Sequence, residues 1–156
     1  MEKELTTQDW NMVSEVELIY KSKVKATLRP RLKSVLEVQE FLRVHWDENK
    51  IELLEQFKLV LLNTGNRVLG LLDLSSGGIC GTVADPRLIF TAALKLHATK
   101  LILSHNHPSG NLTPSEADKQ ITQKLKDAGR LLDIEVIDHI IITAEGYFSF
   151  ADEGLL

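Results

Sequence analysis

Two histidines, His105 and His107, are separated by a single residue and follow an apolar run at positions 101–103. Side chains two positions apart in an extended chain point to the same face, so both imidazoles can converge on one point at the end of a strand. Pro108 and Gly110 then interrupt the strand, and a helix is expected after them. Paired imidazoles in this setting suggest metal chemistry.

A carboxylate that could complete such a site lies at the start of the expected helix. Thr113 is predicted to be the N-cap, Pro114 the first helical residue, and Glu116 the carboxylate that completes a capping box. Asp118 is not needed for capping in this arrangement, and it projects from the same side of the first turns as Ser115. Two imidazoles and one carboxylate are a common ligand set for a catalytic zinc ion that keeps a fourth position for water. One Zn²⁺ per chain is therefore expected, held by the two histidines and this aspartate.

The segment from His105 to Asp118 resembles the metal-binding signature of the JAB1/MPN superfamily, the JAMM motif, in which His-x-His-Pro is followed by Ser-x-x-Asp. The sequence His-Asn-His-Pro-Ser-Gly, together with Asp-His-Ile-Ile at positions 138–141, is similar to the motifs of the RadC-like branch of this superfamily. The resemblance implies a JAB1/MPN fold, a three-layer sandwich like that of cytidine deaminases. It also implies a zinc metallopeptidase or isopeptidase that cleaves amide bonds with a zinc-bound water as nucleophile, and in which Ser115 donates a hydrogen bond to the developing oxyanion.

Such a reaction needs a carboxylate that accepts the proton of the water. Glu55 opens an expected strand and shares a face with Phe57, so it borders apolar surface that should raise its pKa. A solvated glutamate at the start of a strand is the alternative from the residues alone. RadC-like chains place a catalytic glutamate two residues before this phenylalanine. The resemblance therefore implies Glu55 as the general base, with Glu52 as the fallback candidate.

Asp138 and His139 occur inside an expected strand rich in Ile and Val, and two interpretations of them stay open. They could form a buried, hydrogen-bonded pair away from the site, or supply a partner for a metal-bound imidazole. The single cysteine, Cys80, is expected to be a small apolar filler, and it excludes a disulfide framework within the chain.

Strands that alternate with single helices predict an α/β fold with a mixed β-sheet flanked by helices. The expected helices cover residues 34–46, a segment that begins with Asp85 and Pro86, and residues 114 to about 128, which Gly129 would end. Besides the strand that carries the histidines, strands are expected over residues 14–25, 55–63, 67–74, 79–83, 134–143 and 146–150.

The chain divides into an N-terminal extension over residues 1–33, expected to be a strand and a basic linker, and a RadC-like JAB/MPN domain over residues 34–156. The extension holds six basic and no acidic residues between Lys21 and Lys33, which is either a solvated edge or a contact surface for nucleic acid or an acidic partner. Longer RadC proteins carry a helix-hairpin-helix region at their N-terminus. Residues 1–33 look instead like an added strand and a basic linker, and this departure weakens a role in DNA binding. Because RadC-like proteins carry a DNA-repair label, the resemblance implies as the alternative function a DNA-repair or mobile-element accessory module, whose metal site is only structural.

The bulk composition is that of a soluble globular protein, because 44% of the 156 residues are hydrophobic and 26% are charged. A net charge of −4 does not suggest broad nucleic-acid binding. No apolar run approaches the length of a membrane span, and the acidic N-terminus lacks an apolar signal region. We expect a cytoplasmic protein without membrane contact; its oligomeric state is left open.

Overall fold

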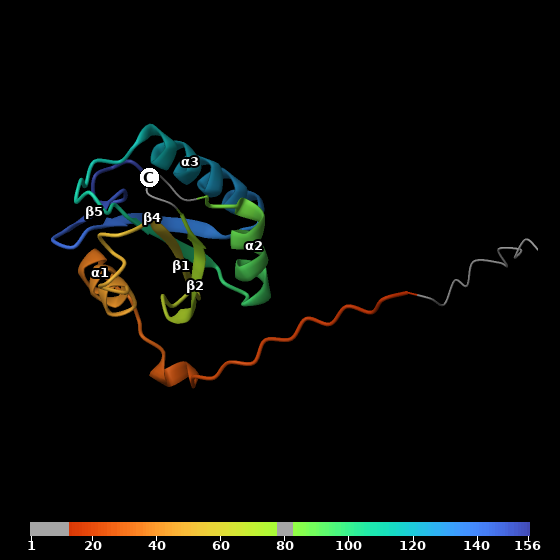
Figure 1. The fold of residues 1–156 in the computed structure, drawn as a ribbon. Helices are drawn as coiled ribbons and strands as arrows, with labels where there is room; N and C mark the ends of the chain where they lie inside the picture. Colours follow the sequence, from red (N-terminus) through yellow and green to blue (C-terminus); the bar gives the residue numbers. More distant parts are fainter. Residues whose placement is uncertain (1–12, 78–82) are drawn as a thin grey trace, which may run out of the picture.

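The computed structural model describes residues 13–77 and 83–156, and its centre is a mixed five-stranded β-sheet (Figure 1). The strands lie in the order β2-β1-β3-β4-β5. β3 and β4 are parallel, and each of the other neighbouring pairs is antiparallel. The predicted α/β class with a mixed sheet is therefore confirmed. The bounds are β1 (Gln56–Leu62), β2 (Val68–Ser76), β3 (Lys100–Asn106), β4 (Glu135–Ile142) and β5 (Tyr147–Ser149).

Helices cover both faces of the sheet and give the predicted three layers (Figure 1). α1 (Val35–Val44) packs with the hydrophobic core on one face, and α2 (Pro86–Lys95) and α3 (Glu116–Leu131) pack with the core on the other. Along β1, Leu59 belongs to the core of the α2–α3 side and Val60 to the core of the α1 side. Since successive strand residues point to opposite faces, a strand covered on both faces reads as a continuous apolar run.

The starts of α1 and α2 follow from their capping residues. Ser34 is the N-cap of α1, and its hydroxyl accepts a backbone hydrogen bond at 3.2 Å, while Asp85 caps α2 as predicted. α3 continues past its expected end, through Gly129 to Leu131. A Cβ at Gly129 would lie 2.2 Å from the carbonyl oxygen of Ile134, so this glycine lets the chain approaching β4 pass close to the helix. Its role is close packing and not the termination of the helix.

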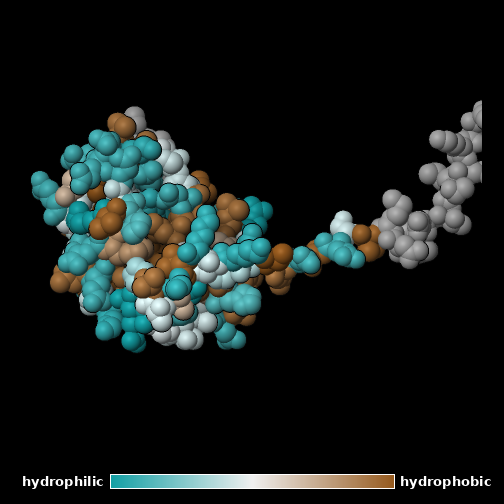
Figure 2. Space-filling view, turned by 90° about the horizontal axis from the view of Figure 1, so that it is seen from below, coloured by the Kyte–Doolittle hydropathy of each residue, from teal (hydrophilic) through white to brown (hydrophobic). Residues whose placement is uncertain are grey.

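The N-terminal segment differs from the prediction, because residues 13–24 form no strand and lead into a short 3-10 helix, η1 (Ala26–Leu28). Leu18 is 85% exposed, and Figure 2 shows the segment running away from the globular body. The Tyr20 hydroxyl donates a hydrogen bond to the carbonyl oxygen of Leu69 at 3.2 Å. Alternation of apolar and polar residues was the only basis for the predicted strand, and alternation does not supply a partner strand.

Residues 30–32, at the end of the predicted N-terminal extension, pair with the chain that enters β2. Val68 N donates to the Pro30 carbonyl and Leu32 N to the Asn66 carbonyl, both at 2.9 Å, so this stretch lies along the start of β2. Leu32 is buried in the core of the α1 side. The strand predicted at 79–83 lies outside the described residues apart from position 83, as does Cys80. Among the described helices, none has the length and apolar character that crossing a membrane requires.

Candidate metal centre

The three predicted ligands, His105, His107 and Asp118, meet at the end of β3. The Nε2 atoms of the two histidines lie 2.9 Å apart, and the Asp118 carboxylate oxygens lie 3.2 Å from His105 Nε2 and 3.5 Å from His107 Nε2. All three ligand atoms fall within 4.8 Å of one another, which is close enough for one metal ion to contact them all. His105 is buried, and the other two side chains are partly exposed. His105 is therefore held in the protein interior, while His107 and Asp118 can be reached from solvent.

The fold brings the ligands together through a single crossover connection, β3–α3–β4. Because β3 and β4 are parallel, the connecting helix must begin near the end of β3, where the histidines lie. His107 N donates to the carbonyl oxygen of Ile142 at 3.0 Å, which continues the β3–β4 pairing by one residue. Gly110 then turns the chain with a φ of 82°, a conformation that glycine adopts without strain. The first turn of α3 consequently faces both imidazoles.

The start of α3 corrects the predicted cap. Ser115, and not Thr113, is the N-cap: its Oγ accepts from Asp118 N at 3.1 Å, and an Asp118 carboxylate oxygen accepts from Ser115 N at 2.7 Å. Glu116 is exposed and pairs with Lys119 at 2.9 Å. The Ser-x-x-Asp spacing is itself a capping-box pattern, so the sequence contained two overlapping candidates. Asp118 therefore both caps the helix and faces the histidines.

The charges of the site are strongly coupled. Burial alone would raise the pKa of Asp118, but hydrogen bonds to His105 and His107 outweigh it, and the pKa lies well below its usual value. The Asp118 carboxylate in turn raises the pKa of His107; burial opposes this shift, and the charge of Glu55 adds to it. The metal-free site thus releases the proton of His107 at a higher pH than a free imidazole would, and a metal ion competes with that proton.

Glu55 lies where the register of the sheet predicts. Phe57 pairs with His105 across antiparallel strands, and continuing that register by two residues places Glu55 opposite His107. The contribution of its charge to the His107 pKa agrees with this proximity. Glu55 is half-buried, whereas Glu52 is exposed and lines a separate cavity beside Trp46. As a candidate for the general base, Glu55 is therefore favoured by the geometry over Glu52.

Asn106, between the two histidines, anchors the segment that carries Glu55. Its side-chain oxygen accepts from Gln56 N at 2.7 Å, and its amide nitrogen donates to the carbonyl oxygens of Ile51 and Leu54 at 2.7 and 2.9 Å. The side chain is fully buried. The sequence placed this residue beside the ligands without a role, and its amide is what connects the ligand strand to the chain entering β1.

Asp138 and His139 have separate functions, so both interpretations left open by the sequence apply in part. His139 Nε2 lies 2.8 Å from His105 Nδ1, and His139 is therefore a partner of a predicted ligand. Asp138 faces β5 instead, where its carboxylate accepts from the Ser149 hydroxyl at 2.7 Å and from Ala151 N at 3.0 Å. Burial, followed by the nearby His105, lowers the pKa of His139, and burial raises the pKa of Asp138.

Thr122 is a site residue that the sequence reasoning missed. Its hydroxyl lies 2.6 Å from His139 Nδ1 and 2.5 Å from the carbonyl oxygen of Asp118. The signal was its position four residues after Asp118, which places both on one face of the helix. A threonine at that spacing is common in helices for packing reasons alone, so the spacing carried little information without the position of His139.

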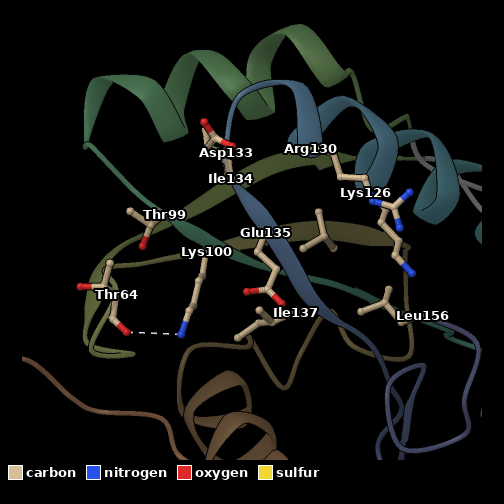
Figure 3. A pocket seen from close by; sticks show the side chains of 11 residues that line it. Thr64, Thr99, Lys100, Lys126, Arg130, Asp133, Ile134, Glu135, Ile137 and Leu156 are labelled. Carbon is tan, nitrogen blue, oxygen red and sulfur yellow. Dashed lines mark hydrogen bonds between the residues drawn. The ribbon is translucent and has the colours of Figure 1, made fainter.

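A second cavity of about 640 Å³ lies at the opposite end of β3 from the histidines (Figure 3). Lys100, at the start of β3, and Glu135, at the start of β4, line it, together with Lys126 and Arg130, which extend from α3. No predicted site residue lines this cavity. Among the described residues, the cluster at the end of β3 is the only group with the spacing of metal ligands.

Comparisons with known proteins agree with the geometry. Residues 32–155 match the family model of the RadC-like JAB domain. The chain is 54% identical over 101 residues to a UPF0758 protein from Flavobacterium johnsoniae, covering 65% of this chain and 44% of the relative. It is 37% identical over 131 residues to a UPF0758 protein from Clostridioides difficile, covering 84% of this chain and 56% of the relative. The chain thus spans about half the length of these relatives.

Proposed function

Since the chain belongs to the RadC-like JAB domain family, we propose that it is a zinc-dependent hydrolase of amide bonds, acting on a peptide, an isopeptide or another amide. The observation that carries the proposal is the convergence of two imidazole Nε2 atoms with the Asp118 carboxylate. Glu55 beside His107 supplies the additional carboxylate that hydrolysis requires.

The donor set fits zinc. His107 Nδ1 lies 2.6 Å from the carbonyl oxygen of Asn111, which can only accept a hydrogen bond, so the proton of a neutral His107 resides on Nδ1 and its Nε2 lone pair faces the cluster. Asp118 stays ionised because its pKa is lowered. Two neutral imidazoles and a carboxylate leave one tetrahedral position open. When bound there, zinc would supply a Lewis acid that polarises a carbonyl group and lowers the pKa of a bound water.

The residues of the chain then have distinct tasks. Glu55 accepts a proton from the attacking water and returns it to the leaving nitrogen. The Ser115 Oγ accepts the hydrogen bond from Asp118 N, so its own proton is available to the carbonyl oxygen of a substrate. Loss of one such donor costs about 2.7–4 kcal/mol of transition-state stabilisation. Asn106 holds the segment that carries Glu55 against β3.

Metal content and turnover test the proposal in two steps. Elemental analysis of tag-free protein should give about one zinc per chain for the wild type and none for His107→Ala. A panel of peptide and isopeptide substrates should then be cleaved by the wild type but not by Glu55→Gln, which should still bind zinc. Glu52→Gln is the matched control and should retain turnover. Zinc-free wild-type protein after exposure to zinc, or an active Glu55→Gln variant, would refute the proposal.

A nucleic-acid or acidic-partner accessory role is a second candidate, favoured by the exposed lysines 21, 23 and 25 of the N-terminal segment. Binding that depends on phosphate contacts must weaken steeply as the salt concentration rises. Replacement of the three lysines by alanine should abolish such binding without changing the zinc content. Absence of binding at low salt would remove this candidate.

A further inference from the structure

We propose that His139 and Thr122 are positioning residues that select the metal-binding tautomer of His105. This inference rests on the metal site of the proposed function but concerns hydrogen bonds that exist without the metal. His139 is fully buried, and its ring lies between Phe57 and Phe150, with ring centroids 5.6 and 4.7 Å away. No carboxylate is among the hydrogen-bond partners of its ring nitrogens, so burial favours a neutral imidazole.

The hydrogen bonds that link His105, His139, Thr122 and the backbone of Asp118 form a network, and its hydrogen atoms can be assigned by starting from Asp118. The carbonyl oxygen of Asp118 can only accept, so the Thr122 hydroxyl donates to it. The same hydroxyl oxygen must then accept from His139 Nδ1–H. A neutral His139 is consequently bare at Nε2, which accepts from His105 Nδ1–H at 2.8 Å. His105 is left with its lone pair on Nε2, the atom that faces the other ligands.

This relay connects two ligands that belong to different elements. It begins at His105 on β3, passes through His139 on β4, and ends at the backbone of Asp118 on α3. The opposite tautomer of His105 would place a proton on Nε2, and that nitrogen could not bind a metal. Metal-ligating histidines usually donate to a carboxylate, a backbone carbonyl or water. Here the acceptor of the hydrogen bond from His105 is a neutral imidazole. His105 should therefore donate its electron pair to a metal ion less strongly, and the bound metal should be a stronger Lewis acid.

Two matched pairs of variants test the relay through zinc affinity, measured by competition with a chelator of known affinity. His139→Leu should weaken zinc binding by about 10- to 100-fold, the usual effect of losing an outer hydrogen-bond partner. His139→Gln, whose amide oxygen can accept from His105 Nδ1–H, should recover most of that loss. Thr122→Val should weaken binding in the same direction, and Thr122→Ser should match the wild type. If His139→Leu fails to fold, the threonine pair decides.

Nitrogen-15 NMR of the histidine rings provides a readout that a purely structural role would not move. In metal-free wild-type protein above the pKa of His107, both His105 and His139 should carry their proton on Nδ1. In Thr122→Val, His139 should lose that preference. A His139 proton on Nε2 in the wild type, or wild-type zinc affinity in both His139→Leu and Thr122→Val, would overturn the inference. Absence of zinc binding with the predicted tautomers would instead refute the proposed function and leave the relay standing.

Discussion

Replacing Asp138 should destabilise the fold without affecting the metal centre, and the structure allows the magnitude to be worked out. The carboxylate accepts long-range hydrogen bonds from the Ser149 hydroxyl and from Ala151 N, and one from the adjacent His139 N, and the residue is only 7% exposed. Asp138→Ala would leave these donors without their acceptor. At about 1–1.5 kcal/mol for each of the two long-range bonds, the expected loss is about 2–3 kcal/mol.

Asp138→Asn is the matched variant, because its amide oxygen can still accept from the two backbone N–H groups. The pH dependence distinguishes it from the wild type. Burial raises the pKa of Asp138. At pH values between the unfolded and the folded pKa, the folded protein therefore holds a proton that the unfolded chain has released. The wild type therefore gains stability from this group below the unfolded pKa of about 3.9 and loses it as the pH rises through the folded value. The asparagine variant lacks this dependence, so its stability relative to the wild type should improve as the pH rises.

Urea and thermal denaturation at pH 4, 5.5 and 7, both followed by circular dichroism, measure the two effects. Asp138→Ala should lower the melting temperature by about 4–12 °C, given about 2–4 °C per kcal/mol for a protein of this size. Zinc affinity should be unchanged in both variants, since the Asp138 carboxylate contacts β5 and the backbone of His139, and none of the imidazole rings of the site. The reasoning would be refuted if the stability of Asp138→Asn relative to the wild type decreased as the pH rises, or if either variant lost zinc binding.

Three other predictions follow from the site and its helix. Zinc affinity should fall by up to about tenfold per pH unit below the raised pKa of His107, because the metal competes with that proton; isothermal titration at several pH values would measure this, and pH-independent affinity would contradict it. Ser115→Ala should cost about 1 kcal/mol of stability through loss of the N-cap, whereas Thr113→Ala should cost much less in the same unfolding assay, and the reverse order would restore the predicted cap. Gly129→Ala should destabilise by about 1–3 kcal/mol, since its Cβ would meet the Ile134 carbonyl, and wild-type stability would show that the close approach is not tight.

The fold could be predicted where one physical signal dominated. The buried strands β1, β3 and β4 each contain an apolar run, at positions 59–62, 101–103 and 140–142. The predicted metal ligands combine a strand end with a strong helix-start pattern. Asp118 was predicted to lie beside the two histidines, and the structure brings the three side chains together. The cap was nevertheless assigned to the wrong residues, because Thr113-x-x-Glu116 and Ser115-x-x-Asp118 satisfy the same rule. The capping box forms at Ser115 and Asp118, and the preceding Pro114 is buried.

The rest depended on contacts distant in sequence. Residues 13–24 alternate as a strand does, but they pair with no strand of the sheet, and the chain at Pro30 and Leu32 pairs only with the start of β2. A strand without a partner does not form. His139 was recognised as a candidate partner of a ligand, yet only the register between β3 and β4, which pairs Leu103 with His139, brings it to His105. Thr122 could not be chosen among the polar residues of α3 until that register was known.

The start of α3 makes folding and metal binding depend on the same hydrogen bonds. Ser115 N and Asp118 N are both satisfied within the capping box, which fixes the carboxylate that faces the histidines. In the proposed reaction, the positive end of the helix dipole would lie beside the substrate oxygen that gains negative charge, and this would favour the transition state. A substitution that loosens the cap should therefore weaken metal binding before it unfolds the domain. We expect Ser115→Ala to lower zinc affinity, although Ser115 contributes no metal ligand, and unchanged affinity would show that the histidines alone hold the carboxylate in place.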